Sequence, residues 1–266
     1  MLKPILLTLL LLGGMPARAD DCGFDAYAKE DYAAALKPLT ECAKQGSAGA
    51  QGLLGFMYSN GQGVPRDYKA AVRWYTLAAE QGHPVAQSDL GVRYELGQGT
   101  PQDFKAAVHW YTLSAEQGHA NAQYNLAVMY SQGEGVPQDF KAAVHWYTLS
   151  AEQGNAKAQF NLGLMYDVGQ GVPQDFKAAV RWYTRAAEQG HANAQSNLGA
   201  SYATGQGVLQ DYVLAHMWRN LAASNGGGKI AVKARDALAS MMTPAQIAEA
   251  QALAQRCLAS NYKDCG

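Results

Sequence analysis

Apolar residues recur along the chain with the spacing of a helix that buries one face. In the segment that starts near residue 47, Ala50, Leu54 and Tyr58 lie four residues apart and therefore share one face of a predicted helix. Gly55 lies beside this stripe, where a neighbouring helix must approach closely. The pattern predicts an amphipathic first helix that packs against another helix.

A second helix is predicted after a short turn. Residues 61–65 read GQGVP, a run that no regular helix tolerates and that favours a turn. Asp67 is a good N-cap for the helix that follows, and Gly82 is placed for a left-handed C-cap at its end. The segment is therefore predicted to form a helical hairpin.

This hairpin pattern recurs with a step of 36 residues. A tryptophan and a glycine of the second helix and a tyrosine of the first keep that step through five repeats. The positions are Trp74, Trp110, Trp146, Trp182 and Trp218; Gly82, Gly118, Gly154, Gly190 and Gly226; and Tyr58, Tyr94, Tyr130, Tyr166 and Tyr202. A fixed period of this length indicates a solenoid, in which each repeat buries its apolar face by stacking on its neighbours.

The repeats divide residues 20–266 into three predicted segments. Five repeats occupy residues 47–226, and residues 20–46 match half a repeat that would cap the N-terminal side. Residues 227–266 are predicted to form C-terminal capping helices, at 230–239 and 244–258. The fifth repeat departs from the others, as expected of a terminal repeat whose outer face meets water.

The first 19 residues have the pattern of a secretory signal peptide. Lys3 precedes an apolar run, and Ala17-Arg18-Ala19 is an A-x-A cleavage signal. The run is shorter than the roughly 20 residues that span a bilayer, so a retained anchor is the weaker alternative. We expect cleavage after Ala19, a periplasmic or secreted mature protein, and no stable membrane span.

The repeated motif resembles the Sel-one-like repeat (SLR) family, a relative of the tetratricopeptide repeat. The fourth repeat carries the resemblance in full, with Ala158-Gln159, Leu162-Gly163, Tyr166, Gly169-Gln170-Gly171-Val172, Asp175, Lys177-Ala178, Trp182-Tyr183, Ala186-Ala187 and Gln189-Gly190. The resemblance implies an all-α, right-handed superhelical solenoid of helical hairpins whose first helices line a concave surface. It also implies a role as an adaptor or scaffold for other proteins.

Positions that vary between repeats on the first helices are the candidates for a protein-binding groove. They include aromatic and aliphatic side chains, a composition typical of a binding patch. The alternative is that this stripe packs on the adjacent repeat. The predicted groove residues are Phe56, Ser88, Asp89, Val92, Tyr124, Asn125, Val128, Phe160, Asn161, Leu164, Ser196 and Asn197, with Phe56, Tyr124 and Phe160 as the expected anchors.

The four cysteines are expected to form two disulfides. An even number of cysteines in an exported chain favours disulfides, although four thiols allow three connectivities. Sequence position favours Cys22 with Cys42 and Cys257 with Cys265, one bridge near each end of the chain. A redox or metal site is disfavoured because no C-x-x-C spacing occurs.

Composition and charge narrow the classes of partner. Hydrophobic residues make up 48% of the chain, which excludes intrinsic disorder. Without Lys3 and Arg18, 19 basic side chains face 22 acidic ones, so nucleic acid is not an expected partner. The expected partner is a protein or peptide; its identity and the oligomeric state are open.

No residue pattern points to catalysis, a metal or a cofactor. His109 and His145 occupy the same repeat position about one hairpin apart, too far for one metal, and the chain lacks H-E-x-x-H, G-x-S-x-G and P-loop motifs. The Gly-x-Gly turns lack the strand of a dinucleotide site and are predicted to be loops. β-Lactamase-like relatives carry a cysteine pair in each repeat, which these five repeats lack.

The expected function is therefore that of an exported, non-catalytic protein that holds another protein in its groove. The resemblance also implies a sharper possibility, an immunity protein that neutralises a secreted antibacterial effector such as a phospholipase. A host-interaction or envelope-biogenesis factor is the alternative, and a β-lactamase-like enzyme is a weaker one.

Overall fold

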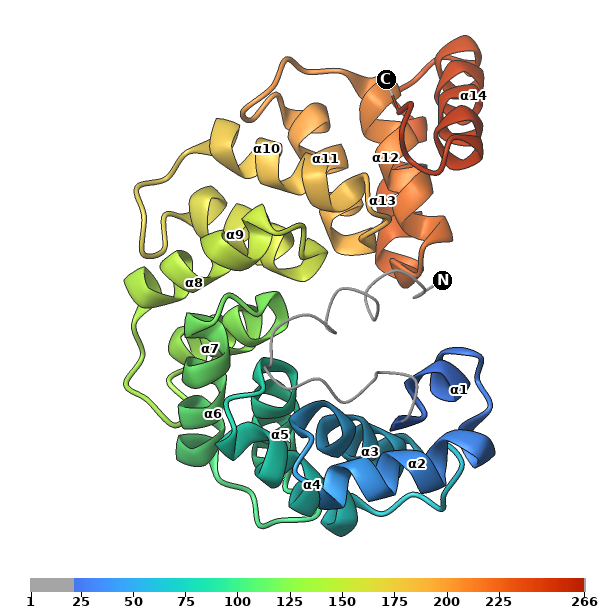
Figure 1. The fold of residues 1–266 in the computed structure, drawn as a ribbon. Helices are drawn as coiled ribbons and strands as arrows, with labels where there is room; N and C mark the ends of the chain where they lie inside the picture. Colours follow the sequence, from blue (N-terminus) through green and yellow to red (C-terminus); the bar gives the residue numbers. More distant parts are fainter. Residues whose placement is uncertain (1–21, 266) are drawn as a thin grey trace. The chain divides into compact units, whose positions relative to one another are not determined.

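The computed structural model describes residues 22–265, which form helices joined by turns, without a β-strand. In chain order the helices are α1 (Phe24–Ala28), α2 (Tyr32–Lys44), α3 (Ala48–Asn60), α4 (Tyr68–Glu80), α5 (Pro84–Leu96), α6 (Phe104–Glu116), α7 (Ala120–Gln132), α8 (Phe140–Glu152), α9 (Ala156–Val168), α10 (Phe176–Ala187), α11 (Ala192–Thr204), α12 (Tyr212–Ser224), α13 (Gly228–Ala239) and α14 (Pro244–Ala259) (Figure 1). The predicted fold class, an all-α solenoid of repeated helical hairpins, is confirmed. The predicted signal peptide lies outside the described residues.

The helices belong to two compact bodies. The first body contains the described residues up to Ala122 together with Glu134–Val136, and the second contains Gln123–Gly133 and the chain from Pro137 onward. None of the helices described here is both long and apolar enough to cross a membrane.

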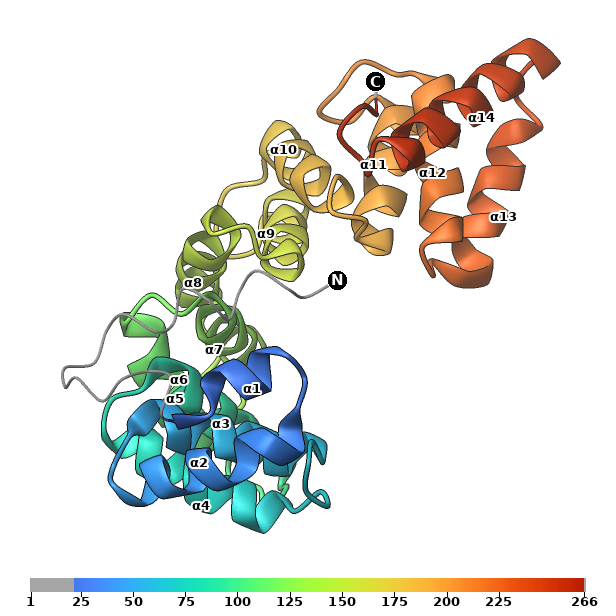
Figure 2. The ribbon, with the colours of Figure 1, turned by 45° about the vertical axis from the view of Figure 1, so that its right-hand side comes forward.

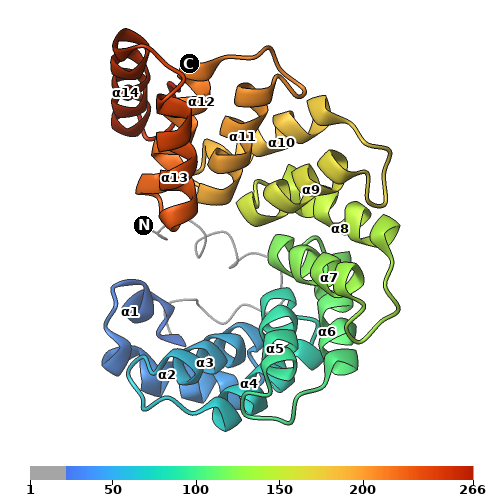
Figure 3. The same cartoon turned by 180° about the vertical axis from the view of Figure 1, so that it is seen from behind.

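In the first body, consecutive helices pack as hairpins. Helix α3 packs against α4 and α5 against α6, while α4 also contacts α5 (Figure 3). Tyr75 of α4 lies in a buried cluster with Ala86 and Leu90 of the following helix, and Trp110 of α6 packs against the same cluster. The stripe of Ala50 and Leu54 is fully buried, as its spacing predicts.

The second body repeats this arrangement and ends in the capping helices. Its largest buried cluster joins Tyr183 of α10, Leu198 of α11, Trp218 of α12 and Ala254 of α14. Helix α12 contacts both α13 and α14 (Figure 2). The capping helices begin and end within two residues of the predicted bounds.

The helix ends follow the predicted capping residues. Asp67 accepts hydrogen bonds from the backbone N–H groups of Lys69 and Ala70, which satisfies donors that a helix start leaves open. Gly82, two residues beyond α4, has φ 82° and donates its N–H to the carbonyl of Ala79. The left-handed cap predicted at Gly82 is confirmed.

The Gly-x-Gly turns are interhelical loops, as predicted, and they also touch the preceding repeat. Gly171 has φ 73°, and a Cβ placed on it would overlap the carbonyl oxygen of Phe140 at the start of α8. Gly207 stands in the same relation to Phe176. The second glycine of the turn is therefore required by backbone packing between repeats as well as by its own conformation.

A row of glutamines connects the repeats. Gln51 of α3 donates to the carbonyl of Ala43, 2.9 Å away, and accepts from Gln81 at the end of α4. In the second body, Gln159 in the same way donates to Ala151 and accepts from Gln189. These buried amides fix each first helix between two second-helix ends, a role that the repeated glutamines alone do not indicate.

Both disulfides are present. Cys22 is bonded to Cys42, with 5.6 Å between their Cα atoms, and this bridge joins the start of α1 to α2 across the turn at Glu30. Cys257 of α14 is bonded to Cys265, with 4.4 Å between the Cα atoms. These are the two pairs that sequence position favoured.

Candidate functional site

The first helices are held by buried tyrosines of the second helices. A Cβ placed on Gly55 would lie 2.5 Å from the ring of Tyr75, and one on Gly163 would lie 2.7 Å from the ring of Tyr183. Helix and ring therefore meet at a distance that only glycine allows at these two positions. The close approach predicted at Gly55 is confirmed.

The hydroxyls of second-helix tyrosines also contact side chains of the first helices. Asn161 donates to the Tyr147 hydroxyl at 3.0 Å. The Tyr183 hydroxyl donates to Asp167 of its own repeat at 3.1 Å, and it interacts with Asn197 of the next repeat. The predicted groove residues Asn161 and Asn197 thus take part in packing between repeats, which is the alternative that the sequence had left open.

A cavity of about 290 Å³ opens between α7 and α9 in the second body. It brings together four of the predicted groove residues, Tyr124, Val128, Asn161 and Leu164. The other lining residues are Ser131, Gln132, Tyr147, Met165 and Gln170, none of which is among the groove residues named from the sequence. None of the lining side chains is charged, so the cavity suits an uncharged group that combines apolar surface with hydrogen-bonding atoms.

The three predicted anchors differ in their surroundings. Phe56 is 38% exposed. The Tyr124 ring packs on Tyr147 with 6.0 Å between centroids, and the Phe160 ring lies 4.8 Å from that of His191. Tyr124 and Phe160 therefore support the fold of the second body and also face the solvent in part.

The prediction that Ser88 lines the groove is wrong. Ser88 is buried, with 3% of its surface exposed, so its side chain cannot contact a partner. The equivalent Gly52 shows why, because a Cβ there would lie 3.6 Å from the His83 ring of the next repeat. A short side chain at this position stays beneath the neighbouring repeat, whereas the longer Tyr124 and Phe160 remain partly exposed.

The remaining predicted groove residues, Val92, Asn125, Ser196 and Asn197, are half-buried. Val92 lies on α5 in the first body, Asn125 on α7 and Ser196 on α11 in the second. Among the residues lining the described cavity, none comes from α5 or α11.

The first body carries a charged cluster at the equivalent place. Asp89 interacts with the Tyr75 hydroxyl, and Glu95 accepts a hydrogen bond from Tyr111. Arg93 lies between them in sequence and stacks over the Tyr68 ring, 5.2 Å from its centroid. Burial raises the pKa of the Asp89 carboxyl to about 6, although the Arg93 charge opposes this.

Replacing Asp89 by asparagine is expected to stabilise the protein above pH 6. Because the folded-state pKa is raised, the protonated carboxyl stabilises the fold fully below about pH 4, and this contribution is lost as pH rises through 6. Asp89→Asn should therefore raise the free energy of unfolding by on the order of 1–3 kcal/mol at pH 7.5 and by almost nothing at pH 4. Asparagine already occupies this position in the three following repeats.

Urea unfolding at the two pH values provides the measurement. The exposed Asp25 offers a matched control, since Asp25→Asn removes the same charge from a solvated site. A gain for Asp89→Asn that is equal at pH 4 and pH 7.5 would show that the Asp89 carboxyl is not held in a desolvated site.

The contacts of four histidines give each of them a structural role or a packing partner. His83 and His191 are N-caps whose Nδ1 atoms accept from the N–H groups of Ala86 and Ala194, and burial lowers the pKa of both. His109 and His145 are exposed, and each ring contacts the tryptophan that follows it. Between residues 22 and 265, no group of three His, Cys, Asp or Glu side chains is arranged to hold a metal ion.

A family model and a solved structure both match the repeats of this chain. The family model described as the Sel1 repeat matches residues 48–83, 84–119, 120–155, 156–191 and 192–227. A Sel1 repeat protein from Oxalobacter formigenes has a similar structure, with 37% identity and a TM-score of 0.71 over 77% of this chain and 84% of that one. The comparison with curated proteins gives no match.

Two further solved structures resemble the chain more distantly. The first is c5321, a protective antigen of uropathogenic Escherichia coli with an SLR fold, at 29% identity and a TM-score of 0.40 over 91% of this chain and 69% of that one. The second is the immunity protein Pa5087 from Pseudomonas aeruginosa, at 19% identity and a TM-score of 0.49 over 81% of this chain and 84% of that one.

Proposed function

The chain belongs to the Sel1 repeat family, and from that premise we propose that it is an exported, non-catalytic protein that binds another protein on its first helices. The observation that carries the proposal is the uncharged cavity between α7 and α9, which gathers Tyr124, Val128, Asn161 and Leu164. Its mixture of aromatic, aliphatic and amide groups fits the buried centre of a protein interface.

The charge distribution along the repeats supports this choice of face. Helices α3, α7 and α11 carry no charged side chain, whereas α10 carries Lys177, Arg181 and Arg185. Depletion of charge is a feature of interface centres because charged groups lose hydration when they are covered. Helix α9, on the other side of the cavity from α7, carries Lys157 and Asp167, but neither lines the cavity. The uncharged helix α7 and the uncharged lining of α9 are therefore better suited to contact a partner than the charged helix α10.

Substitutions in the cavity provide the test of this function. Val128→Asp combined with Leu164→Asp places two carboxylates in an uncharged site, and we expect more than a roughly tenfold loss of partner retained in a pull-down with the oxidised protein. Arg181→Asp, an equally drastic change on the exposed side of α10, is the matched control and should retain the partner.

The fold of each variant is checked separately by circular dichroism and thermal unfolding. Leu164→Ala removes only apolar contact from the cavity wall, and it should weaken retention without the added charges. If both cavity variants retain the partner as well as Arg181→Asp does, the cavity is not the binding site.

The proposal includes export to the periplasm or the medium. Two disulfides support it, because such bonds persist in oxidising compartments and are rare in reducing ones. N-terminal sequencing of the mature protein gives the measurement, with Asp20 as the expected first residue.

Neutralisation of a secreted antibacterial effector is the specific form of the function that we propose. It requires that the chain bind an effector encoded beside it and protect cells that produce both proteins. Protection should be lost in the Val128→Asp, Leu164→Asp variant and kept in Arg181→Asp. Unchanged toxicity with the wild-type chain would leave a host-interaction or envelope role as the alternative.

A further inference from the structure

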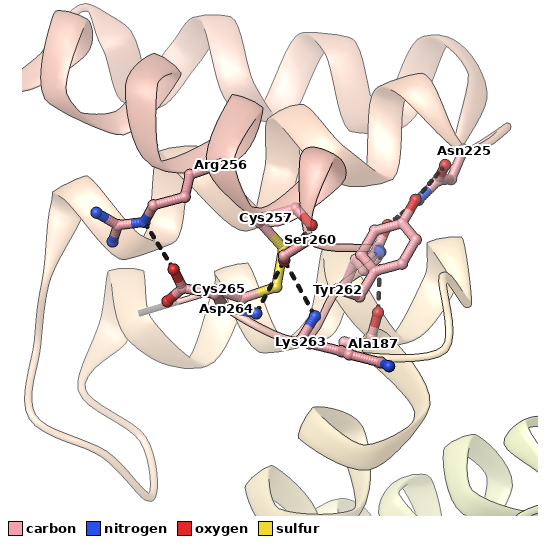
Figure 4. The surroundings of a disulfide bond; sticks show 10 residues. Ala187, Asn225, Arg256, Cys257, Ser260, Tyr262, Lys263, Asp264 and Cys265 are labelled. Atoms are coloured by element: carbon pink, nitrogen blue, oxygen red, sulfur yellow. Dashed lines mark hydrogen bonds and ion pairs between the residues drawn. A yellow bond between two sulfur atoms is a disulfide. The ribbon is translucent and has the colours of Figure 1, made fainter.

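The C-terminal residues 260–265 form a tightly held strap after α14. Cys265 at its end is bonded back to Cys257, and Arg256 forms an ion pair with Asp264 at 3.3 Å (Figure 4). The Ser260 hydroxyl accepts hydrogen bonds from the N–H groups of the two residues preceding Cys265. The strap is therefore fixed by covalent, ionic and hydrogen bonds within eight residues of sequence.

The backbone of the strap is strained where it presents Tyr262. Asn261 and Tyr262 have φ values of 53° and 64°, in the left-handed region that bulky side chains rarely adopt. Such a conformation persists where the surrounding structure enforces it, and it is concentrated at functional positions.

Tyr262 contacts the ends of two successive hairpins, one at Asn225 and the other at Gly190. Its hydroxyl donates to Asn225 at 2.9 Å and accepts from the same amide at 2.7 Å (Figure 4). Asn225 in turn donates to Gln195, at the last position of the glutamine row. The Tyr262 ring lies beside Gly190, where a Cβ would be 3.4 Å from it.

Fixed in this way, the strap forms one wall of a second cavity, of about 470 Å³. Tyr262 and Lys263 line it from the strap, while Gln159, Arg185, Glu188 and Gln189 line it from α9 and the end of α10. It shares no lining residue with the cavity between α7 and α9. The two cavities are separate sites of the second body.

The charges of this second cavity favour an anion. Arg185 and Lys263 contribute two positive charges against the single negative charge of Glu188. The Arg185 guanidinium lies 4.7 Å from the Trp182 ring centroid, a contact that orients it without neutralising it. Within residues 22–265, neither Arg185 nor Lys263 forms an ion pair, so both remain able to bind a carboxylate.

We propose that the cavity between the C-terminal strap and α10 binds a carboxylate group of a peptide, and that the Cys257–Cys265 disulfide keeps this site assembled. The carboxylate comes from an acidic side chain or from a chain end, which share the same chemistry. The site is independent of the proposed binding on the first helices, because the two have no lining residue in common.

Three acetylated tripeptides serve as probes in titrations followed by NMR of the oxidised protein. One has a central glutamate and an amidated end, one a central glutamine and a free C-terminal carboxylate, and one a central glutamine and an amidated end. We expect at least one carboxylate probe to bind at least roughly fivefold more tightly than the neutral probe, with shifts at Tyr262 and Lys263. Which of the two binds identifies the source of the carboxylate.

Matched variants separate the site from general charge effects. Arg185→Gln should weaken binding of the carboxylate probe roughly fivefold to tenfold. Arg181→Gln should leave it unchanged, because Arg181 is exposed one turn earlier on α10 and does not line the cavity. Cys257→Ser with Cys265→Ser should remove the preference for carboxylate, and Cys22→Ser with Cys42→Ser should not. Folding of all variants is checked by circular dichroism.

The proposal is overturned if no probe binds, if the neutral probe binds as tightly as both carboxylate probes, or if Arg181→Gln and Arg185→Gln have equal effects. Retention of full carboxylate binding without the Cys257–Cys265 bridge would overturn the role assigned to the disulfide. None of these outcomes depends on partner binding at the first helices, so the two proposals fail separately.

Discussion

Gly171→Ala is expected to lower the free energy of unfolding by about 3 kcal/mol or more, and Gly154→Ala by only about 1 kcal/mol. Both glycines have positive φ values, 73° and 90°, so alanine is strained at either position. Only at Gly171 would the new Cβ overlap a backbone atom, the carbonyl oxygen of Phe140, whereas Gly154 has open space around it. The difference between the two variants isolates the packing of the loop on the preceding repeat.

Urea unfolding of the two variants and the wild type measures this difference. Equal losses for Gly171→Ala and Gly154→Ala would mean that only local backbone conformation selects glycine at these positions. The contact between each loop and the preceding repeat would then contribute little to the stability of the solenoid.

Removal of the Cys22–Cys42 bridge is expected to have the second large effect. Cys22→Ala with Cys42→Ala should lower the free energy of unfolding by about 2–4 kcal/mol, because the bridge closes a loop with a sequence separation of 20 residues. Cys22 is also buried, so its removal costs packing as well as the bond. The Cys257–Cys265 bridge spans only 8 residues, so its removal should cost less.

Denaturation with and without a reducing agent checks this order. The reductant should destabilise the wild type strongly and the Cys22→Ala, Cys42→Ala variant only slightly. A larger loss on removing the Cys257–Cys265 bridge than the Cys22–Cys42 bridge would contradict the expected dependence on loop length.

The hairpins could be predicted from the sequence because each repeat restates the same local signals. Asp67 begins a helix and Gly82 follows its end in the structure as the residue types predict. The disulfide pairs followed from their positions in the chain. Local propensity and period were sufficient here because the packing within each hairpin, such as α3 on α4 and α9 on α10, joins elements that are neighbours in sequence.

The candidate site could be predicted only in part. The helical arc placed Val128 and Leu164 on one face, and the structure brings them into one cavity. Ser88 lies on the same arc but is buried, because burial depends on side-chain length against the next repeat. The period alone does not show which hydroxyl Asn161 contacts.

Apart from Cys265, no residue pattern in the sequence predicted the C-terminal strap. Residues after α14 do not repeat, so no comparison between repeats identifies Tyr262 as a partner of Asn225. The glutamine row was visible as a repeated residue, but its hydrogen bonds join residues 30 apart and require the three-dimensional arrangement. Contacts between repeats are thus the part that sequence reasoning missed.

Site-specific photo-crosslinking tests the central proposal, protein binding at the cavity between α7 and α9, most directly. A photoreactive phenylalanine analogue is placed at Leu164 in the cavity wall, at Arg181 on the exposed side of α10, or at Lys141 on the exposed side of α8. The proposal predicts one covalent adduct of defined mass from position 164 and none from positions 181 and 141. Adducts from 181 or 141, with none from 164, would contradict it.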